Sequence, residues 1–447
     1  MENQLLDYER QHLEQLRALA PECTLFLKRS GKLPLPGPCE IALYGSGARH
    51  TVKGGTGSGE VNSRSFLNIE ESLSRAGFQI LTKDWLDRYD AVRKDAYAAF
   101  LKKIRSDARK HRTSPLIKGM GAVMPEPEYE IPLEQRCNTA VYVLSRISGE
   151  GSDRKVVPGD VLLSESEKRD ILALQEMYPV FLLVLNVGGP VDLSPVVQDV
   201  DDILLLSQLG VQTGAVLSDI LLGEAYPSGK LTTSWVRGGD FCPQAEFGEK
   251  EETHYKEGIY VGYRYYDAAH VKPLFPFGFG LGYTDFRLEP GAVTLAGEQV
   301  TVSAQVRNTG AFSGKEVVQL YLSSPWGALD QPAQALAAYG KTRELAPGES
   351  CRMELRFKMS DLASFDEARS AYVLEKGDYV LRCGNSSRKC KPMALLRLTH
   401  EVVTLQARDL LGKPDFSDWK PEGPEPIPEG LPVYVLDAGS IPTKTLS

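Results

Sequence analysis

The sequence is poor in the patterns from which metal sites and disulfide frameworks are built. It has six histidines, none of them at HxH or HxxxH spacing, and seven cysteines, an odd number without a CxxC pair. This spacing gives no recognisable zinc site, so we expect no metal. Cys383 and Cys390 could flank a hairpin and form a bridge, but a scattered set of this kind does not indicate a disulfide framework.

Long apolar runs and an excess of positive charge are missing as well. No apolar run reaches the roughly 18 residues that a membrane span needs. The 51 Lys and Arg residues stand against 59 Asp and Glu, a net charge of −8. This balance argues against nucleic acid or a membrane as the main partner. Residues 1–19 are charged and helical in pattern, without a basic-then-apolar signal, so a cytoplasmic location is expected.

The composition fits an ordinary soluble protein of two or three domains, with 447 residues, of which 42% are hydrophobic. Up to residue 285, short β-rich runs alternate with helical stretches. The runs are apolar on both faces, as strands of a buried parallel sheet should be; they lie at 40–44, 78–81, 140–147, 180–187 and 202–206, with 231–235 as a candidate sixth run. Residues 1–285 are therefore predicted to form an α/β domain with a doubly wound, mostly parallel sheet (an α/β sandwich). Residues 84–132 read as a helical insertion followed by a Pro-rich crossing.

After residue 285 the pattern changes to a period of two. Val300, Val302, Ala304 and Val306 alternate with polar residues and end in an Asn-Thr-Gly turn. Such strands predict an all-β sandwich of fibronectin type III or immunoglobulin type over residues 286–400. Residues 401–447 read as a Pro-rich linker or tail, because a stretch of that composition cannot pack a core alone.

The most informative loop is residues 145–154, SRISGEGSDR, which follows the apolar run at 140–144. Glu150 lies there between Gly149 and Gly151, which allow a sharp turn and a close approach by a ligand. A partly desolvated carboxyl on such a loop can act as a general acid. The alternative is an ordinary solvated glutamate. Arg154 would lower the pKa of Glu150 if the two paired, so we expect Asp153 to hold Arg154 instead.

A second glycine-rich loop, KGGTGSGE at residues 53–60, follows the first β-rich run. It lacks the GxxxxGK[ST] pattern of a phosphate-binding loop, and a Rossmann glycine triplet is missing too, so we expect no nucleotide cofactor. A flexible turn remains possible, as does close approach to a neutral polyol, with Ser58 supplying a hydroxyl. Both loops follow the carboxyl ends of predicted parallel strands, where open α/β sheets bind ligands.

Two further motifs have competing interpretations. The tyrosine-rich run at 260–267, YVGYRYYD, could stack on a sugar, or it could form the seam between the two domains. The tripeptide Ser-Asp-Trp at 417–419 lies in the Pro-rich stretch, with Lys and Pro directly after it. That context is typical of a linker and not of a buried strand.

These motifs together resemble glycoside hydrolase family 3, the β-glucosidase type, over roughly residues 10–400. The resemblance includes NVGGP at 186–190, PSGKL at 227–231 and FGFGLGYT at 277–284. It implies that Glu150 is the acid/base catalyst and that Ser58, Gly57 and Thr56 bind substrate. It also implies that the acid/base loop is shaped by the four residues Gly149, Gly151, Asp153 and Arg154.

The sequence departs from the family pattern in its organisation. The family usually begins with a (β/α)8 barrel that carries the nucleophilic aspartate, within an SDW tripeptide on a strand. No barrel is present here, so the chain looks like the front half of a circularly permuted member. Two smaller departures are Ser207 and Gln212, where the family often has Trp and Glu.

The resemblance implies a retaining β-glycosidase whose nucleophile comes from a barrel in cis or in trans. The substrates would be β-linked oligosaccharides or aryl and alkyl β-glycosides, and the chain alone would be nearly inactive. The alternative is a non-catalytic carbohydrate-binding or assembly subunit.

Overall fold

The computed structural model describes residues 5–57, 61–148, 153–240, 252–410, 412, 414–423 and 426–445. The chain divides into two compact units, the first containing residues 1–230, 237–239 and 280–283, and the second the remainder. Of the helices in the described ranges, none has both the length and the apolar character needed to cross a bilayer.

The first unit is built on a six-stranded sheet with the order β1-β6-β5-β4-β2-β3. All neighbouring strands are parallel except the edge pair β1 and β6, which confirms the predicted mostly parallel sheet. The strands are β1 (Leu25–Lys28), β2 (Glu40–Tyr44), β3 (Gln79–Ile80), β4 (Thr139–Arg146), β5 (Val180–Val187) and β6 (Ile203–Leu205). The run at 231–235 does not enter this sheet; Trp235 bridges instead to Phe275 in the second unit.

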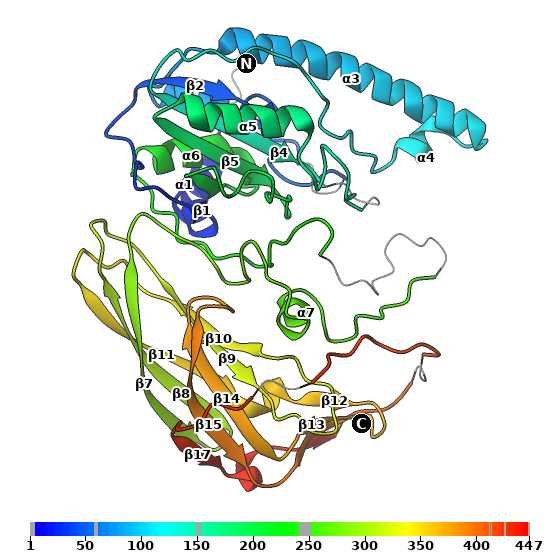
Figure 1. The fold of residues 1–447 in the computed structure, drawn as a ribbon, viewed down its shortest axis with the longest axis vertical. Coiled ribbons are helices and arrows are strands. Elements are labelled where there is room, and N and C mark those ends of the chain that lie inside the picture. Colours follow the sequence, from blue (N-terminus) through cyan, green and yellow to red (C-terminus); the bar gives the residue numbers. More distant parts are fainter. Residues whose placement is uncertain are drawn as a thin grey trace. The chain divides into compact units, whose positions relative to one another are not determined.

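Helices lie on both sides of this sheet (Figure 1). Two of the helices begin with a capping box: the Asn68 side chain accepts from the Glu71 N–H at 2.8 Å, and the Ser164 hydroxyl accepts from the Glu167 N–H at 3.2 Å. The helices are α1 (Asp7–Leu19), α2 (Ile69–Arg75), α3 (Lys83–Lys110), α4 (Pro115–Gly119), α5 (Glu165–Met177) and α6 (Thr213–Leu221). Helix α3 lies in the predicted helical insertion, whereas the short helix α4 forms within the stretch expected to be a Pro-rich crossing.

The crossing from α4 to β4 is fastened by the buried side chain of Glu126, which is 5% exposed. Its carboxylate accepts a hydrogen bond from the Tyr89 hydroxyl on α3 and lies 3.9 Å from Arg93. The Glu126 N–H donates to the Gly159 carbonyl at 2.8 Å. One residue therefore ties the crossing both to α3 and to the segment that follows the loop of Glu150.

Burial raises the pKa of Glu126 from its ordinary 4.5 to about 7. Between these two values the folded state holds the proton more tightly than the unfolded chain does. The free energy of unfolding should therefore fall by roughly 3 kcal/mol as pH rises from about 4.5 to 7. Urea titrations of the wild type and E126Q across this range test the effect. The variant E130Q, at an exposed position nearby, should show the wild-type dependence of the unfolding free energy on pH. If E126Q shows that same dependence, Glu126 is not the group responsible for it.

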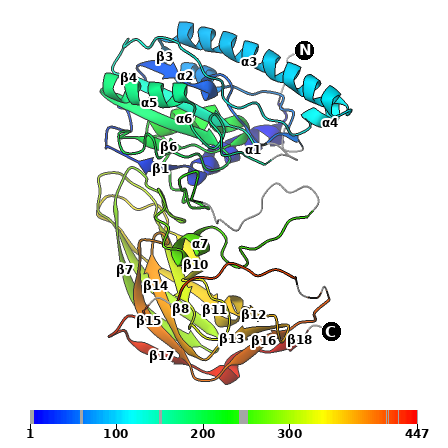
Figure 2. The ribbon, with the colours of Figure 1, turned by 45° about the vertical axis from the view of Figure 1, so that its right-hand side comes forward.

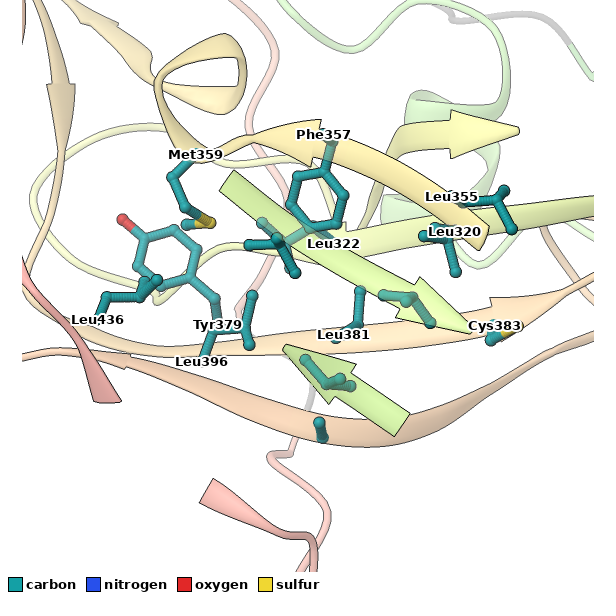
Figure 3. Close-up of a cluster of buried hydrophobic side chains, with 14 of the residues drawn as sticks. Leu320, Leu322, Leu355, Phe357, Met359, Tyr379, Leu381, Cys383, Leu396 and Leu436 are labelled. Atoms are coloured by element: carbon teal, nitrogen blue, oxygen red, sulfur yellow. The ribbon is translucent and has the colours of Figure 1, made fainter. Parts of the chain in front are cut away.

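The second unit contains a three-stranded, a five-stranded and a four-stranded sheet. The alternating residues Val300, Val302, Ala304 and Val306 are each at most 1% exposed, as predicted. Figure 3 shows Leu320, Leu322 and Phe357 in the same core, contributed by strands of two sheets. The elements are α7 (Tyr263–Ala268), β7 (Phe286–Ala296), β8 (Gln299–Asn308), β9 (Val317–Ser323), β10 (Ala335–Lys341), β11 (Ser350–Lys358), β12 (Ser364–Asp366), β13 (Ala371–Leu374), β14 (Gly377–Gly384), β15 (Cys390–Leu398), β16 (Val402–Gln406), β17 (Val433–Leu436) and β18 (Lys444–Thr445).

The predicted tail contributes to this second unit more than a linker would. Strand β17 pairs with β15, and β18 pairs with β16, both in parallel. Leu436 and Ile441 are 2% and 5% exposed and belong to the core. The expectation of a mere linker is therefore wrong for residues 402–406 and 433–445.

The tyrosine-rich run and the SDW tripeptide meet within the second unit. Tyr260, Tyr265 and Tyr266 are buried, and the Trp419 ring lies edge-on to Tyr260 and Tyr265 with centroids 5.0 Å apart in each case. Trp419 also donates its backbone N–H to the Lys256 carbonyl at 2.6 Å. These tyrosines are core residues here, not an open stacking platform, and the tripeptide lies outside any strand.

Candidate active site

The strand order places a topological switch point between β2 and β4. From β2 the chain passes through α2 to β3 on one side, whereas β4, β5 and β6 follow on the other. Open α/β sheets bind ligands at the carboxyl ends of the two strands that flank such a point. Both loops selected from the sequence start there, one after β2 and one after β4.

The structure brings these two loops into contact. The Thr56 N–H donates to the Ser148 carbonyl at 3.0 Å, and the Thr56 hydroxyl approaches the same oxygen at 3.3 Å. Gly57, the next residue, has a φ of +76°, which favours glycine. The catalytic candidate Glu150 and its flanking Gly149 and Gly151 lie outside the described residues, as does Ser58.

Small residues allow the segment after β2 to lie directly against β4. A Cβ atom on Gly45, whose φ is +86°, would come within 2.4 Å of the Val143 carbonyl oxygen. A Cβ on Gly47 would lie 2.2 Å from the Ser145 hydroxyl. Glycine is therefore required at both positions for this close approach.

Asn186 fastens three segments at the same edge of the sheet. Its fully buried side chain donates to the carbonyls of Val52 at 2.9 Å and Ser207 at 2.8 Å. Its Oδ1 accepts from the Val52 N–H at 2.7 Å and from the Ser145 hydroxyl at 2.9 Å. In the sequence, Asn186 stands out only as part of a family signature. Its signal was a lone amide inside the apolar run of β5, because a buried amide needs partners.

The segment that begins at residue 153 is held in place by Arg154. Its guanidinium binds the Asp160 carboxylate at 2.7 Å and the carbonyls of Asp160 and Pro190 at 2.8 Å each. The expected pairing with Asp153 is wrong, since the ion-pair partner of Arg154 within the described ranges is Asp160. Asp160 is also bound by the Lys155 N–H at 2.7 Å. Arg154 thus closes the base of the loop that begins at Ser148.

A buried ion pair between Arg146 and Glu167 lies next to Asp160, the residue that binds Arg154. Arg146, at the end of β4, binds Glu167 in the first turn of α5 through two contacts of 2.8 and 2.6 Å. The side chains are 5% and 1% exposed. The Nε–H of Arg146 also donates to the Asp160 carbonyl at 2.9 Å. Burial alone would lower the pKa of Arg146, but the Glu167 carboxylate outweighs it and the pKa lies above its usual value.

The two departures from the family pattern have local structural roles. Ser207 has a φ of +62° and presents its carbonyl to Asn186. The Gln212 side chain donates to the Leu13 carbonyl on α1 at 3.3 Å. Across the described residues, no three His, Cys, Asp or Glu side chains gather as metal ligands would.

Comparison with known proteins identifies the family. The model for the glycosyl hydrolase family 3 C-terminal domain matches residues 24–283, and that for a fibronectin type III-like domain matches residues 316–387. The chain belongs to glycoside hydrolase family 3. The predicted fold classes of both parts are thereby confirmed.

Relatives within the family are β-glucosidases. Beta-glucosidase A of Butyrivibrio fibrisolvens is 34% identical over 88% of this chain and 51% of its own length. A beta-glucosidase of Ruminococcus albus is 30% identical over 90% of this chain and 42% of its own length. The structure of beta-glucosidase 3B from Thermotoga neapolitana in complex with α-D-glucose superimposes with a TM-score of 0.75, at 34% identity, over 88% of this chain and 55% of that one. The chain therefore spans about half the length of these relatives.

Proposed function

We propose that this chain supplies the acid/base half of a retaining β-glycosidase active site, with Glu150 as the acid/base. The contact between Thr56 and Ser148 carries this proposal, because it joins the two candidate loops at the switch point. Glu150 follows Ser148 by two residues in the sequence. Membership in a family with β-glucosidase relatives supports β-glycosides as the substrate class.

The proposed reaction needs a second carboxylate, roughly 5 Å from the first. An aspartate on a (β/α)8 barrel, in cis or in trans, attacks the anomeric carbon while Glu150 protonates the departing oxygen. Glu150 then takes a proton from water, which attacks the same carbon and releases the aspartate. Thr56, Gly57 and Ser58 contact the sugar hydroxyls in this arrangement.

The surroundings of Arg154 suit this role for Glu150. A general acid must keep its proton near neutral pH, and a neighbouring cation would lower its pKa. The guanidinium of Arg154 is already engaged by Asp160 and by two backbone carbonyls. Arg154 and Asp160 therefore act as positioning residues for the loop.

The isolated chain is expected to show no hydrolysis of 4-nitrophenyl β-glucoside above background, because it lacks the nucleophile and cannot orient the sugar alone. Adding a separately produced barrel domain should restore release of 4-nitrophenol, which absorbance measures. Hydrolysis by the isolated chain that survives Glu150→Ala would refute the proposal. Sugar binding without any activity in the combined sample would favour the non-catalytic alternative.

A further inference from the structure

The second half of α3 and the short helix α4 form a projection that we call the basic arm, residues 92–120. Figures 1 and 2 show α3 extending past the rest of the first unit, with α4 folded back at its far end. The two helices pack closely, since a Cβ atom on Gly119 would lie 3.5 Å from Ile104. Ala108 is fully buried in this contact region, so the arm is an ordered element and not a loose loop.

The arm carries charge of one sign. It contains nine lysines and arginines but only two acidic residues, Asp95 and Asp107. Arg93, nearest the sheet, lies beside Glu126. The other eight are exposed, and within the described part of the chain none of them has an ion-pair partner. These eight are Lys94, Lys102, Lys103, Arg105, Arg109, Lys110, Arg112 and Lys118.

The positive charge of the arm cannot be recognised from the net charge of the whole chain. Without the arm, the chain has 42 Lys and Arg against 57 Asp and Glu, so the acidic residues that give the net charge of −8 lie elsewhere. A net charge averages over segregated regions and cannot exclude an anionic partner for one of them. The net charge of −8 therefore does not exclude an anionic membrane as the partner of the arm.

The far end of the arm also exposes large apolar side chains. Leu116, Ile117 and Met120 are 78%, 65% and 70% exposed, and Lys118 lies between them in the sequence. The inner side of α4 is occupied by its contact with α3, so these three side chains face outward. Exposed apolar groups gathered in one place indicate a contact surface.

We propose that the basic arm binds the surface of an anionic phospholipid bilayer. Lysine and arginine are attracted to anionic headgroups, while exposed apolar side chains enter the boundary between headgroups and acyl chains. A soluble polyanion would engage the eight cations but leave Leu116, Ile117 and Met120 in water. A bilayer satisfies both features of the arm, and the inference does not depend on the proposed catalytic role.

The test is sedimentation of the chain with vesicles of 30% phosphatidylglycerol in phosphatidylcholine. Binding is expected at low salt, with release at high salt and none to pure phosphatidylcholine. The variant K102E/K103E/R105E should bind at least about tenfold more weakly. A matched variant with three exposed lysines of the second unit reversed, K376E/K391E/K444E, should bind like the wild type.

The apolar side chains are tested separately. The variant L116S/I117S/M120S should keep the wild-type circular dichroism, because these side chains are exposed, but lose at least about tenfold in vesicle binding. Unaltered vesicle binding by this variant would overturn the proposal. The proposal would also fail if the wild-type protein bound heparin but did not bind vesicles. Concentration-dependent dimers without vesicle binding would assign the arm to a second copy and would overturn it as well.

Discussion

Replacing Glu150 with glutamine is expected to lower kcat/KM for alkyl β-glucosides roughly 10²–10⁴-fold when the chain is assayed with its barrel domain, the usual contribution of general acid–base catalysis. The amide is similar in size but can neither donate the proton to the leaving oxygen nor accept one from water. The loss should shrink for aryl glycosides with strongly activated leaving groups, which depart without protonation. Initial rates over a leaving-group series measure this.

Azide provides a second readout for the same variant. A small anion attacks the glycosyl–aspartate intermediate without needing a base, so azide should accelerate E150Q and yield a glycosyl azide. The control is E176Q, which replaces an exposed glutamate on α5 and should match the wild type. If the hydrolysis rate of E150Q depends on the leaving group as that of the wild type does and is not raised by azide, Glu150 is not the acid/base.

The other large effect is expected at the buried pair of Arg146 and Glu167. Glu167→Gln leaves a buried guanidinium without its charge partner, which should cost about 3–5 kcal/mol in the free energy of unfolding. Replacing both residues, as in R146M/E167L, removes the uncompensated charge and should recover much of that loss. Urea denaturation followed by circular dichroism measures both values.

The control is a solvent-exposed ion pair in the second unit. Arg343 and Glu349 lie 2.6 Å apart, with side chains 59% and 38% exposed. Glu349→Gln should leave the unfolding midpoint nearly unchanged, because solvent screens such pairs. A Glu167→Gln midpoint equally close to the wild type would show that the buried contact contributes little.

The inner strands of the first unit were predictable because each is a continuous apolar run. The elements at the edges of the sheet were harder to predict. Strand β1 has four residues and an antiparallel partner, so nothing in its local pattern marks it as part of the same sheet. The run at 231–235 has strand-like residues but belongs to the second unit, where Trp235 bridges to Phe275. Pairing with distant segments, and not propensity, decides these cases.

In the candidate site, too, some features could be predicted from the sequence and others could not. The two loops could be placed at one sheet edge, because parallel strands that alternate with helices dictate it. The partner of Arg154 could not be predicted, because the adjacent Asp153 is the obvious candidate whereas Asp160 arrives through a turn. Asn186 was likewise hard to interpret, since its four contacts come from three separate segments.

The pairing of β17 with β15 has a practical consequence for anyone who divides a longer protein into pieces. The proline-rich stretch has the composition of a linker, but a cut there removes β17 and leaves one side of β15 without a neighbour. An uncovered strand of this kind is a template for pairing between molecules, and the fragment should aggregate. A cleavage site or fusion junction belongs beyond residue 445.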